Sequence, residues 1–147
     1  MRYLLVLTFI LSLTAPANAA TGTVREILDG DTVDISVNGT LVRLRFAGIG
    51  APELHNIVPC AAALGLAAKA RVVQLLAGQE IRYESLGLDK YKRIIAMIYL
   101  DDVWVSELLV REGLARLIPA YPVAKVDRAR LIAAEAEART AHRGLWK

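Results

Sequence analysis

The chain has 147 residues, of which 55% are hydrophobic and 22% are charged, and its formal net charge is +3 at pH 7. This length fits one domain rather than two, and the composition excludes intrinsic disorder, which requires low hydrophobicity and a high net charge. A single cysteine excludes an intramolecular disulfide framework and a multi-cysteine zinc site, and the small positive charge does not by itself identify a polyanionic partner.

The N-terminal segment has the organisation of a secretory signal peptide. Arg2 supplies a positive start, residues 3–13 are mostly apolar, and Ala-Asn-Ala at 17–19 has the small-x-small pattern of a cleavage site. An uncleaved membrane anchor is the alternative, but the apolar run is shorter than the roughly 20 residues that span a bilayer. We therefore expect residues 1–19 to be removed and residues 20–147 to form an exported domain, periplasmic or secreted, without membrane attachment after cleavage.

Three alternating runs predict a three-stranded antiparallel meander over residues 22–47. Apolar and polar side chains alternate over residues 23–28, 33–37 and 42–46. Asn38-Gly39 separates the second and third runs and favours a type I′ hairpin, because both residue types tolerate a positive φ. Asp29-Gly30 separates the first two runs in the same way.

The hydrophobic period changes to that of a helix over residues 60–77. The proline before this segment suits a first helical turn, and the glycine after it suits a helix end. Two further strands are predicted around residues 81–83 and over residues 93–100, with a polar loop over residues 87–92 between them.

Two helices are predicted after the last strand. Ser106 is expected to cap a short helix that runs through Arg111 and ends at Gly113, and residues 124–142 form a last helix that Gly144 ends. Five strands with a helix between the third and the fourth is the arrangement of the OB-fold, a partly open barrel. The predicted fold class is therefore α+β, mainly β: a five-stranded OB-fold barrel with three helices.

Five segments carry a family resemblance. They are DGDTV at 29–33, RFAGIGAPE at 45–53, DKYKR at 89–93, VREGLA at 110–115 and GLW at 144–146. Each is weak alone, but with their order and spacing they cover nearly all of the mature chain, which resembles the staphylococcal nuclease (thermonuclease-like) family. The resemblance implies calcium-dependent hydrolysis of DNA and RNA phosphodiesters that leaves 3′-phosphates.

Hydrolysis of a phosphodiester requires cationic groups, because the anionic ester gains charge as water attacks. Arginines suit this role, since their planar guanidinium groups bind phosphate oxygens in a bidentate manner and keep their charge. The resemblance implies that Arg45 and Arg93 are the two phosphate-binding arginines. It also implies that Glu53 is the carboxylate beside the attacking water, in a catalytic set of Arg45, Glu53 and Arg93.

The metal site that the resemblance implies is incomplete. Asp31 matches one calcium-binding carboxylate, and the backbone carbonyl of Ala51 matches a further ligand. Gly50, however, stands where the family has its second calcium-binding Asp. Because calcium affinity depends on the number of charged ligands, we expect a divalent metal site, Ca²⁺ by resemblance, that is weak or altered.

Two positions match residues that line the nucleotide pocket in the family, Lys90 and Tyr121. Lys92 is a further departure, because the family usually has Gly before the second arginine. A lysine there either changes how Arg93 is presented or adds a cation near the phosphate.

Each of these residues also has a purely structural interpretation. Asp31 fits an Asx turn, and Arg45 fits a salt bridge with Glu53 or Asp31 on the strand. Glu53 fits the start of a loop, and Arg93 fits a solvated strand start. Only the fold can bring the four together.

Cys60 is expected to be buried or half-buried at the start of a helix, in a monomeric protein. The alternative is a disulfide-linked dimer through Cys60, since a lone thiol in an oxidising compartment can pair with another chain.

Two functions from different classes remain open at the level of sequence. The first is an exported, metal-dependent nuclease whose substrate is DNA or RNA and whose activity is weakened by Gly50. The second is a catalytically degraded OB-fold module that binds nucleic acid or a protein partner. The retained set of Asp31, Arg45, Glu53 and Arg93 favours the enzyme.

Overall fold

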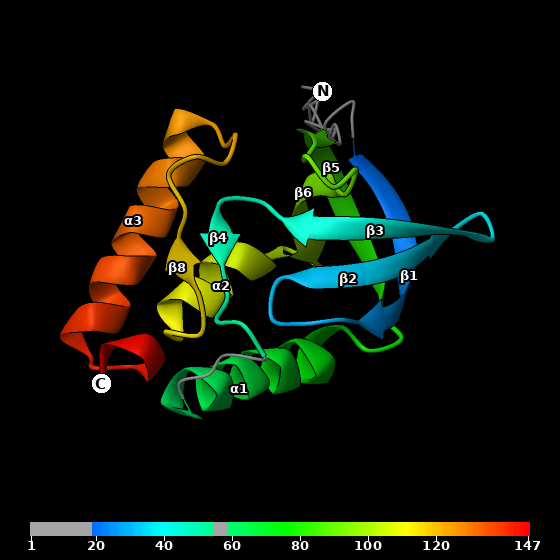
Figure 1. Ribbon diagram of the computed structural model, residues 1–147. Coiled ribbons are helices and arrows are strands. Elements are labelled where there is room, and N and C mark those ends of the chain that lie inside the picture. The colour runs from blue at the N-terminus through cyan, green and yellow to red at the C-terminus, as the bar shows by residue number, and fades with distance from the viewer. Residues whose placement is uncertain (1–18, 55–58) are drawn as a thin grey trace, which may run out of the picture.

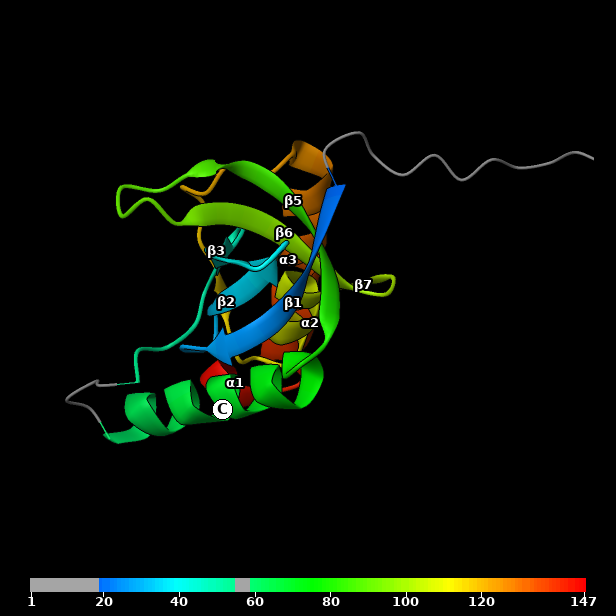
Figure 2. The same ribbon diagram turned by 90° about the vertical axis from the view of Figure 1, so that its right-hand side faces the viewer.

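Five strands close into a barrel (Figure 1; Figure 2). The computed structural model describes residues 19–54 and 59–147, so the expected signal segment lies, except for Ala19, outside the described residues. The strands are β1 (Ala19–Ile27), β2 (Thr32–Val37), β3 (Thr40–Phe46), β5 (Glu80–Leu88) and β6 (Ile94–Leu100). They pair in the order β3-β2-β1-β5-β6, and a parallel pairing of β3 with β6 closes the sheet. The predicted five-stranded barrel is confirmed.

The β2–β3 hairpin shows how local sequence sets the register of the barrel. Asn38 and Gly39 adopt φ values of 49° and 83°, and Val37 pairs with Thr40, as a two-residue turn requires. The inward-facing apolar residues of both strands are completely buried: Val33, Ile35, Leu44 and Phe46. A slip by one residue would expose all of them, so the turn and the core specify the same register.

Helix α1 (Pro59–Leu76) covers one end of the barrel (Figure 1). Its buried face carries Ala68, Val72 and Leu76, in agreement with the predicted helix over residues 60–77. The helix is also long and apolar enough to cross a membrane, with a mean hydropathy of 1.3, so the expectation from sequence that no segment after the signal peptide is long and apolar enough to do so is wrong. Only 22% of this helix is buried, and one helix of this length and composition is weak evidence for a membrane span.

The C-terminal part of the chain packs beside the barrel (Figure 1). It contains β7 (Val103–Trp104), α2 (Val105–Arg111), β8 (Arg116–Leu117), α3 (Lys125–Thr140) and a 3₁₀ turn at Gly144–Trp146. The short strand β4 (Ile49–Gly50) pairs with β8 and so connects this part to the end of β3. The backbone N–H of Leu145 donates to the carbonyl of Gly113, which brings the C-terminal turn back onto the body as expected.

The predicted capping role of Ser106 is wrong. Helix α2 begins at Val105, its N-cap is Trp104, two residues before Ser106, and no side chain caps it. The Ser106 hydroxyl instead donates to the carbonyl of Ala47 over 3.0 Å, and Ser106 is completely buried. The hydroxyl therefore joins α2 to the segment between β3 and β4, a tertiary contact that local sequence does not signal.

We expect Ser106→Ala to lower the free energy of unfolding by about 1–3 kcal/mol, because it leaves the buried carbonyl of Ala47 without its donor. Denaturant unfolding of the variant measures this loss. The matched control is Ser85→Ala at an exposed position, which should change stability by less than about 0.5 kcal/mol. Equal stability of the two variants would show that the Ser106 bond contributes nothing.

Candidate active site

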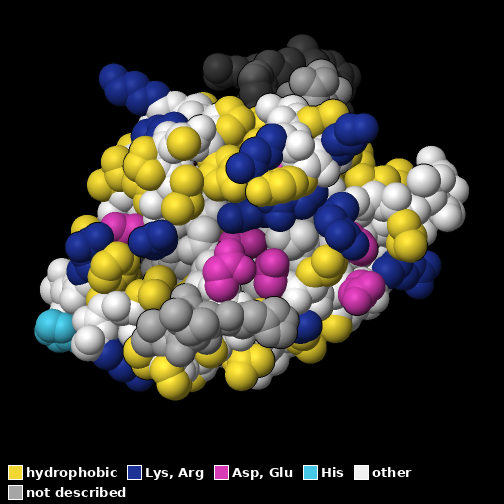
Figure 3. Space-filling model, in the orientation of Figure 1, with side chains coloured by type: hydrophobic (Ala, Val, Ile, Leu, Met, Phe, Trp, Pro, Cys, Tyr) yellow, Lys and Arg dark blue, Asp and Glu magenta, His cyan; other side chains and the backbone are white. Residues whose placement is uncertain are grey.

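A cleft of about 370 Å³ lies where the 29–31 turn, the end of β3 and residues 50–53 meet. Its lining residues are Asp29, Asp31, Arg45, Gly50, Ala51, Pro52, Glu53, Arg93, Arg116, Ile118 and Tyr121. The four side chains that sequence could not bring together therefore share one cavity. Figure 3 shows a group of acidic side chains on the face that carries β4 and β8, with a row of Lys and Arg side chains directly above it.

Arg45 is held in a fixed orientation at the end of β3. It is 8% exposed, and its Nη2 lies 3.0 Å from Oδ2 of Asp31. Its Nη1 donates to the backbone carbonyls of Asp31 and Phe46 over 3.4 and 3.3 Å. The guanidinium also lies 5.2 Å from the centre of the Tyr121 ring. The structural interpretation of Arg45, a salt bridge with Asp31, is thus observed at the wall of the cleft.

Both oxygens of the Asp31 carboxylate accept hydrogen bonds. Oδ2 accepts the N–H of Ala51 over 2.6 Å in addition to its contact with Arg45, and Oδ1 accepts the hydroxyl of Thr32 over 3.2 Å. The N–H of Asp31 itself donates to Oδ1 of Asp29, so the Asx turn here is formed by the Asp29 side chain and not, as considered from sequence, by that of Asp31. Burial raises the pKa of Asp31 to about 6, although Arg45 and the Ala51 N–H act in the opposite direction, and the nearby Asp29 adds to the rise.

Glu53 reaches the cleft because its chain segment packs closely on α1. A Cβ at Gly65 of the helix would lie 2.8 Å from the carbonyl oxygen of Pro52 and 2.9 Å from that of Glu53. At the other side, a Cβ at Gly30 would lie 2.7 Å from the Cβ of Ala51. Only glycine allows both approaches, and they leave Glu53 exposed at the mouth of the cleft.

Asp89 positions Arg93. Its Oδ1 accepts the backbone N–H groups of Tyr91 and Arg93 over 2.8 and 3.0 Å, and its Oδ2 accepts Nε of Arg93 over 2.6 Å. Burial tends to raise the pKa of Asp89, but these hydrogen bonds outweigh it and lower that pKa. The turn that presents Arg93 is therefore held by a charged side chain.

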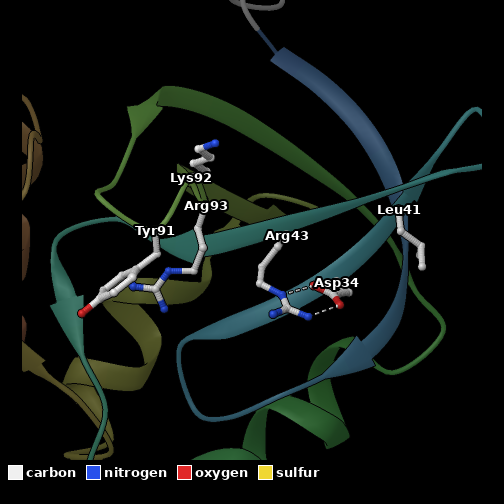
Figure 4. A pocket seen from close by; sticks show the side chains of 6 residues that line it. All are labelled: Asp34, Leu41, Arg43, Tyr91, Lys92 and Arg93. Atoms are coloured by element: carbon white, nitrogen blue, oxygen red, sulfur yellow. Dashed lines mark hydrogen bonds and ion pairs between the residues drawn. The ribbon is translucent and has the colours of Figure 1, made fainter.

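A second groove adjoins the cleft through Arg93. It has a volume of about 750 Å³, and its other lining residues are Asp34, Leu41, Arg43, Tyr91 and Lys92 (Figure 4). Arg43 is held by Asp34 through two hydrogen bonds of 2.7 and 2.8 Å. Lys92 adopts a φ of 62°, and its side chain points away from the guanidinium of Arg93 (Figure 4). Lys92 thus lines the groove and not the cleft.

The donors of the cleft do not fit a directly bound calcium ion. Gly50 supplies no carboxylate, and both oxygens of Asp31 are already hydrogen-bonded or ion-paired. Among residues 19–54 and 59–147, no three His, Cys, Asp or Glu side chains form a group that could hold a metal. Calcium requires six to eight oxygen ligands, several of them charged. The backbone carbonyl of Ala51 and the exposed Glu53 do not make up this deficit.

Two sequence-based assignments differ from the structure, and the sequence interpretation also missed residues that line the cleft. Lys90 is not among the residues that line the cleft, and its ammonium lies 4.9 Å from the Tyr91 ring centre instead. Cys60 is exposed rather than buried or half-buried. Arg116 and Ile118 line the cleft although the sequence interpretation did not select them. Arg116 directly follows the matched segment at 110–115, and this adjacency was the available signal.

Comparison with known proteins identifies relatives over most of the chain. The model of the staphylococcal nuclease homologue family matches residues 43–147. The chain is similar to a micrococcal nuclease from Shigella flexneri, with 32% identity over 134 residues that cover 85% of this chain and 72% of that protein. It is 30% identical over 146 residues to an uncharacterized endonuclease from Escherichia coli, covering 99% of this chain and 89% of that one. It is also 31% identical over 126 residues to a thermonuclease from Staphylococcus intermedius, with coverages of 84% and 74%.

Gly65→Ala tests the close packing that places Glu53. Helix propensity alone predicts that this change stabilises the protein by about 1 kcal/mol. We expect the opposite sign, a loss of about 1–3 kcal/mol in the free energy of unfolding, because the added methyl group collides with backbone oxygens that cannot rotate away. Denaturant unfolding gives the sign, and a stabilised variant would contradict the packing described here.

Asp89→Asn tests the anchor of Arg93. The pKa of Asp89 is lowered by folding, so its contribution to stability is present at neutral pH and is lost as the pH falls through the folded-state pKa. We expect the variant to be less stable at neutral pH by about 1 kcal/mol. This difference should vanish in acid, where the wild-type carboxyl is also neutral.

Unfolding curves measured across this pH range give the result, with Asp102→Asn at an exposed position as the control. A stability difference that does not depend on pH would show that the charge of Asp89 is not what holds the turn.

Proposed function

Because the chain belongs to the staphylococcal nuclease family, we propose that it is a nuclease that hydrolyses phosphodiester bonds of DNA or RNA. The observation that supports this most directly is the shared cleft, which gathers Arg45, Glu53 and Arg93 from three separate parts of the chain. Two guanidinium groups and one exposed carboxylate are the groups that such a reaction requires.

In the proposed reaction, the scissile phosphate binds between the two arginines. Arg45 is immobilised by its bonds to Asp31 and the backbone, and Arg93 by Asp89, so neither must reorganise when charge develops. Preorganised donors of this kind stabilise a phosphoryl transition state more than mobile ones do.

Glu53 is proposed to accept the proton of the attacking water. The water oxygen forms a bond to phosphorus, its proton passes to the Glu53 carboxylate, and the bond from phosphorus to the 5′-oxygen breaks. The leaving oxygen takes a proton from solvent, and Glu53 then releases its proton to solvent. The products are a 3′-phosphate and a free 5′-hydroxyl, so the sum of the steps is hydrolysis.

Nucleases of this family are generally metal-dependent. In this chain the donors around Gly50 do not fit calcium, and the steps proposed here use only side chains that are present.

We also propose that the protein acts outside the cytoplasm after cleavage behind Ala19, on the strength of the N-terminal sequence pattern. In this proposal it works as a monomer on a nucleic acid substrate. Cys60 is exposed in the first turn of α1, which leaves its thiol accessible to a second chain in an oxidising compartment.

The alternative is a binding module that has lost catalysis, and Gly50 is the observation in its favour. Such a module binds an oligonucleotide in a salt-dependent manner and leaves it intact.

Glu53→Gln separates the two functions. The change removes the proposed proton acceptor at an exposed position, so we expect the cleavage rate of labelled single-stranded DNA and RNA to fall by about 10²–10⁴-fold without loss of stability. Glu80→Gln, also exposed but on β5, is the matched control and should retain the wild-type rate.

The assay is run with calcium, magnesium, manganese and a chelator. If the wild-type protein never exceeds Glu53→Gln in any of these conditions, the nuclease proposal is wrong. Salt-dependent oligonucleotide binding without cleavage would then identify the binding module.

A further inference from the structure

We propose that Arg116 takes the place of the metal ion in this cleft, so that a third guanidinium group rather than a divalent cation neutralises the phosphate. This inference rests on the proposed function and names the group that completes the site. The observation that supports it is the pairing of β4 with β8, in which Gly50 lies directly opposite Arg116.

The position of Arg116 is fixed by the backbone around it. Leu117 pairs with Ile49, and its N–H donates to Oε2 of Glu135 over 2.8 Å. The N–H of Ile118 donates to the carbonyl of Gly48, also over 2.8 Å. Strand β8 therefore cannot slide relative to the segment that carries Gly50, and Arg116 and Gly50 line the same cleft.

The space beside Gly50 is filled by an alkyl group. A Cβ at Gly50 would lie 3.1 Å from both Cγ1 and Cδ1 of Ile118. A side chain at this position would require Ile118 to shift by a few tenths of an ångström, and its Cβ would lie against apolar atoms.

The lining of the cleft carries equal numbers of carboxylates and guanidinium groups, not counting Asp89, which pairs with Arg93 from outside this lining. The lining includes three carboxylates, from Asp29, Asp31 and Glu53, and three guanidinium groups, from Arg45, Arg93 and Arg116. An Asp at position 50 would add a fourth carboxylate and create the negative excess that attracts a divalent cation. With Gly50, a cation at this place would instead meet the positive charge of Arg116.

Within the described part of the chain, the guanidinium of Arg116 is free to bind a ligand, unlike those of the other two arginines of the cleft. Arg45 is paired with Asp31 and Arg93 with Asp89, whereas the guanidinium of Arg116 has no ion pair or hydrogen bond with any residue in 19–54 or 59–147. Its side chain is exposed, so it can bind two phosphate oxygens in a bidentate manner.

The first measurement is cleavage of a quenched, labelled single-stranded DNA oligonucleotide in the presence of a chelator. The wild-type protein should keep its rate when divalent metals are removed, and Arg116→Gln should lose about 10²–10³-fold. The control is Arg25→Gln at an exposed position of β1 outside the cleft lining, which should keep the wild-type rate.

The second measurement is binding of the same oligonucleotide, in chelator, to proteins that also carry Glu53→Gln. The slope of log K against log salt concentration should decrease in magnitude by about one when Arg116→Gln is added, which corresponds to the loss of one phosphate contact. The slope should not change when Arg25→Gln is added. This readout does not require cleavage, so it decides the role of Arg116 even if the wild-type protein proves to be a binding module.

The third measurement is calorimetric titration with calcium chloride. The wild-type protein should show no binding, and the double variant Gly50→Asp with Arg116→Gln should gain it. Tight calcium binding by the wild-type protein overturns the inference, as does a wild-type rate that chelator abolishes. An unchanged salt slope for Arg116→Gln overturns it as well. Absence of cleavage in every condition, together with a reduced salt slope, refutes the proposed nuclease but supports phosphate binding by Arg116.

Discussion

The buried ion pair between Asp31 and Arg45 is the interaction on which the cleft depends. Its side chains are only 8% and 9% exposed, and a buried charge is stable only when it is paired and hydrogen-bonded. Through this pair and the Ala51 N–H, the 29–31 turn, the end of β3 and residues 51–53 are held together. Removal of either charge leaves the other uncompensated, at a cost of about 3–5 kcal/mol. The geometry of Arg45 and the path of the segment that carries Glu53 thus have one common cause.

This pair also explains why acidic residues line a cleft that does not fit calcium. Asp29 accepts the N–H of Asp31, and Asp31 fixes Arg45, so both carboxylates stabilise the wall of the cleft from within the protein. Burial raises the pKa of Asp31 to about 6, and Arg45 and the Ala51 N–H act against this rise, so these partners favour the charged form that desolvation disfavours. Glu53 differs, because it is exposed and available to solvent water. The same residue types that resemble a metal site in sequence therefore have separate tasks in the structure.

Local signals in the sequence were sufficient for the barrel and insufficient for parts of the site. Alternation, the Asn38-Gly39 turn and helical periodicity are properties of neighbouring residues, and the structure confirms each of them. The Ser106 hydroxyl has a partner 59 positions away, so a pattern that suggested a cap could not reveal it. Arg116 and Ile118 likewise enter the cleft only because β8 pairs with β4. The motif at 45–53 showed that a carboxylate is missing at position 50, but only the fold shows that Arg116 lies opposite Gly50.

The 89–93 turn shows how a departure in sequence can leave the geometry of a site intact. Lys92 adopts a left-handed backbone conformation that costs a non-glycine residue about 1–2 kcal/mol. Three hydrogen bonds to the Asp89 carboxylate and a backbone bond from the Lys92 N–H to the Asp89 carbonyl impose this conformation. Arg93 is therefore presented by Asp89, and glycine is not required before it. Because the Lys92 side chain points away from Arg93 (Figure 4), its charge belongs to the neighbouring groove. Among the described residues that line the cleft, the positive charge comes from arginine alone.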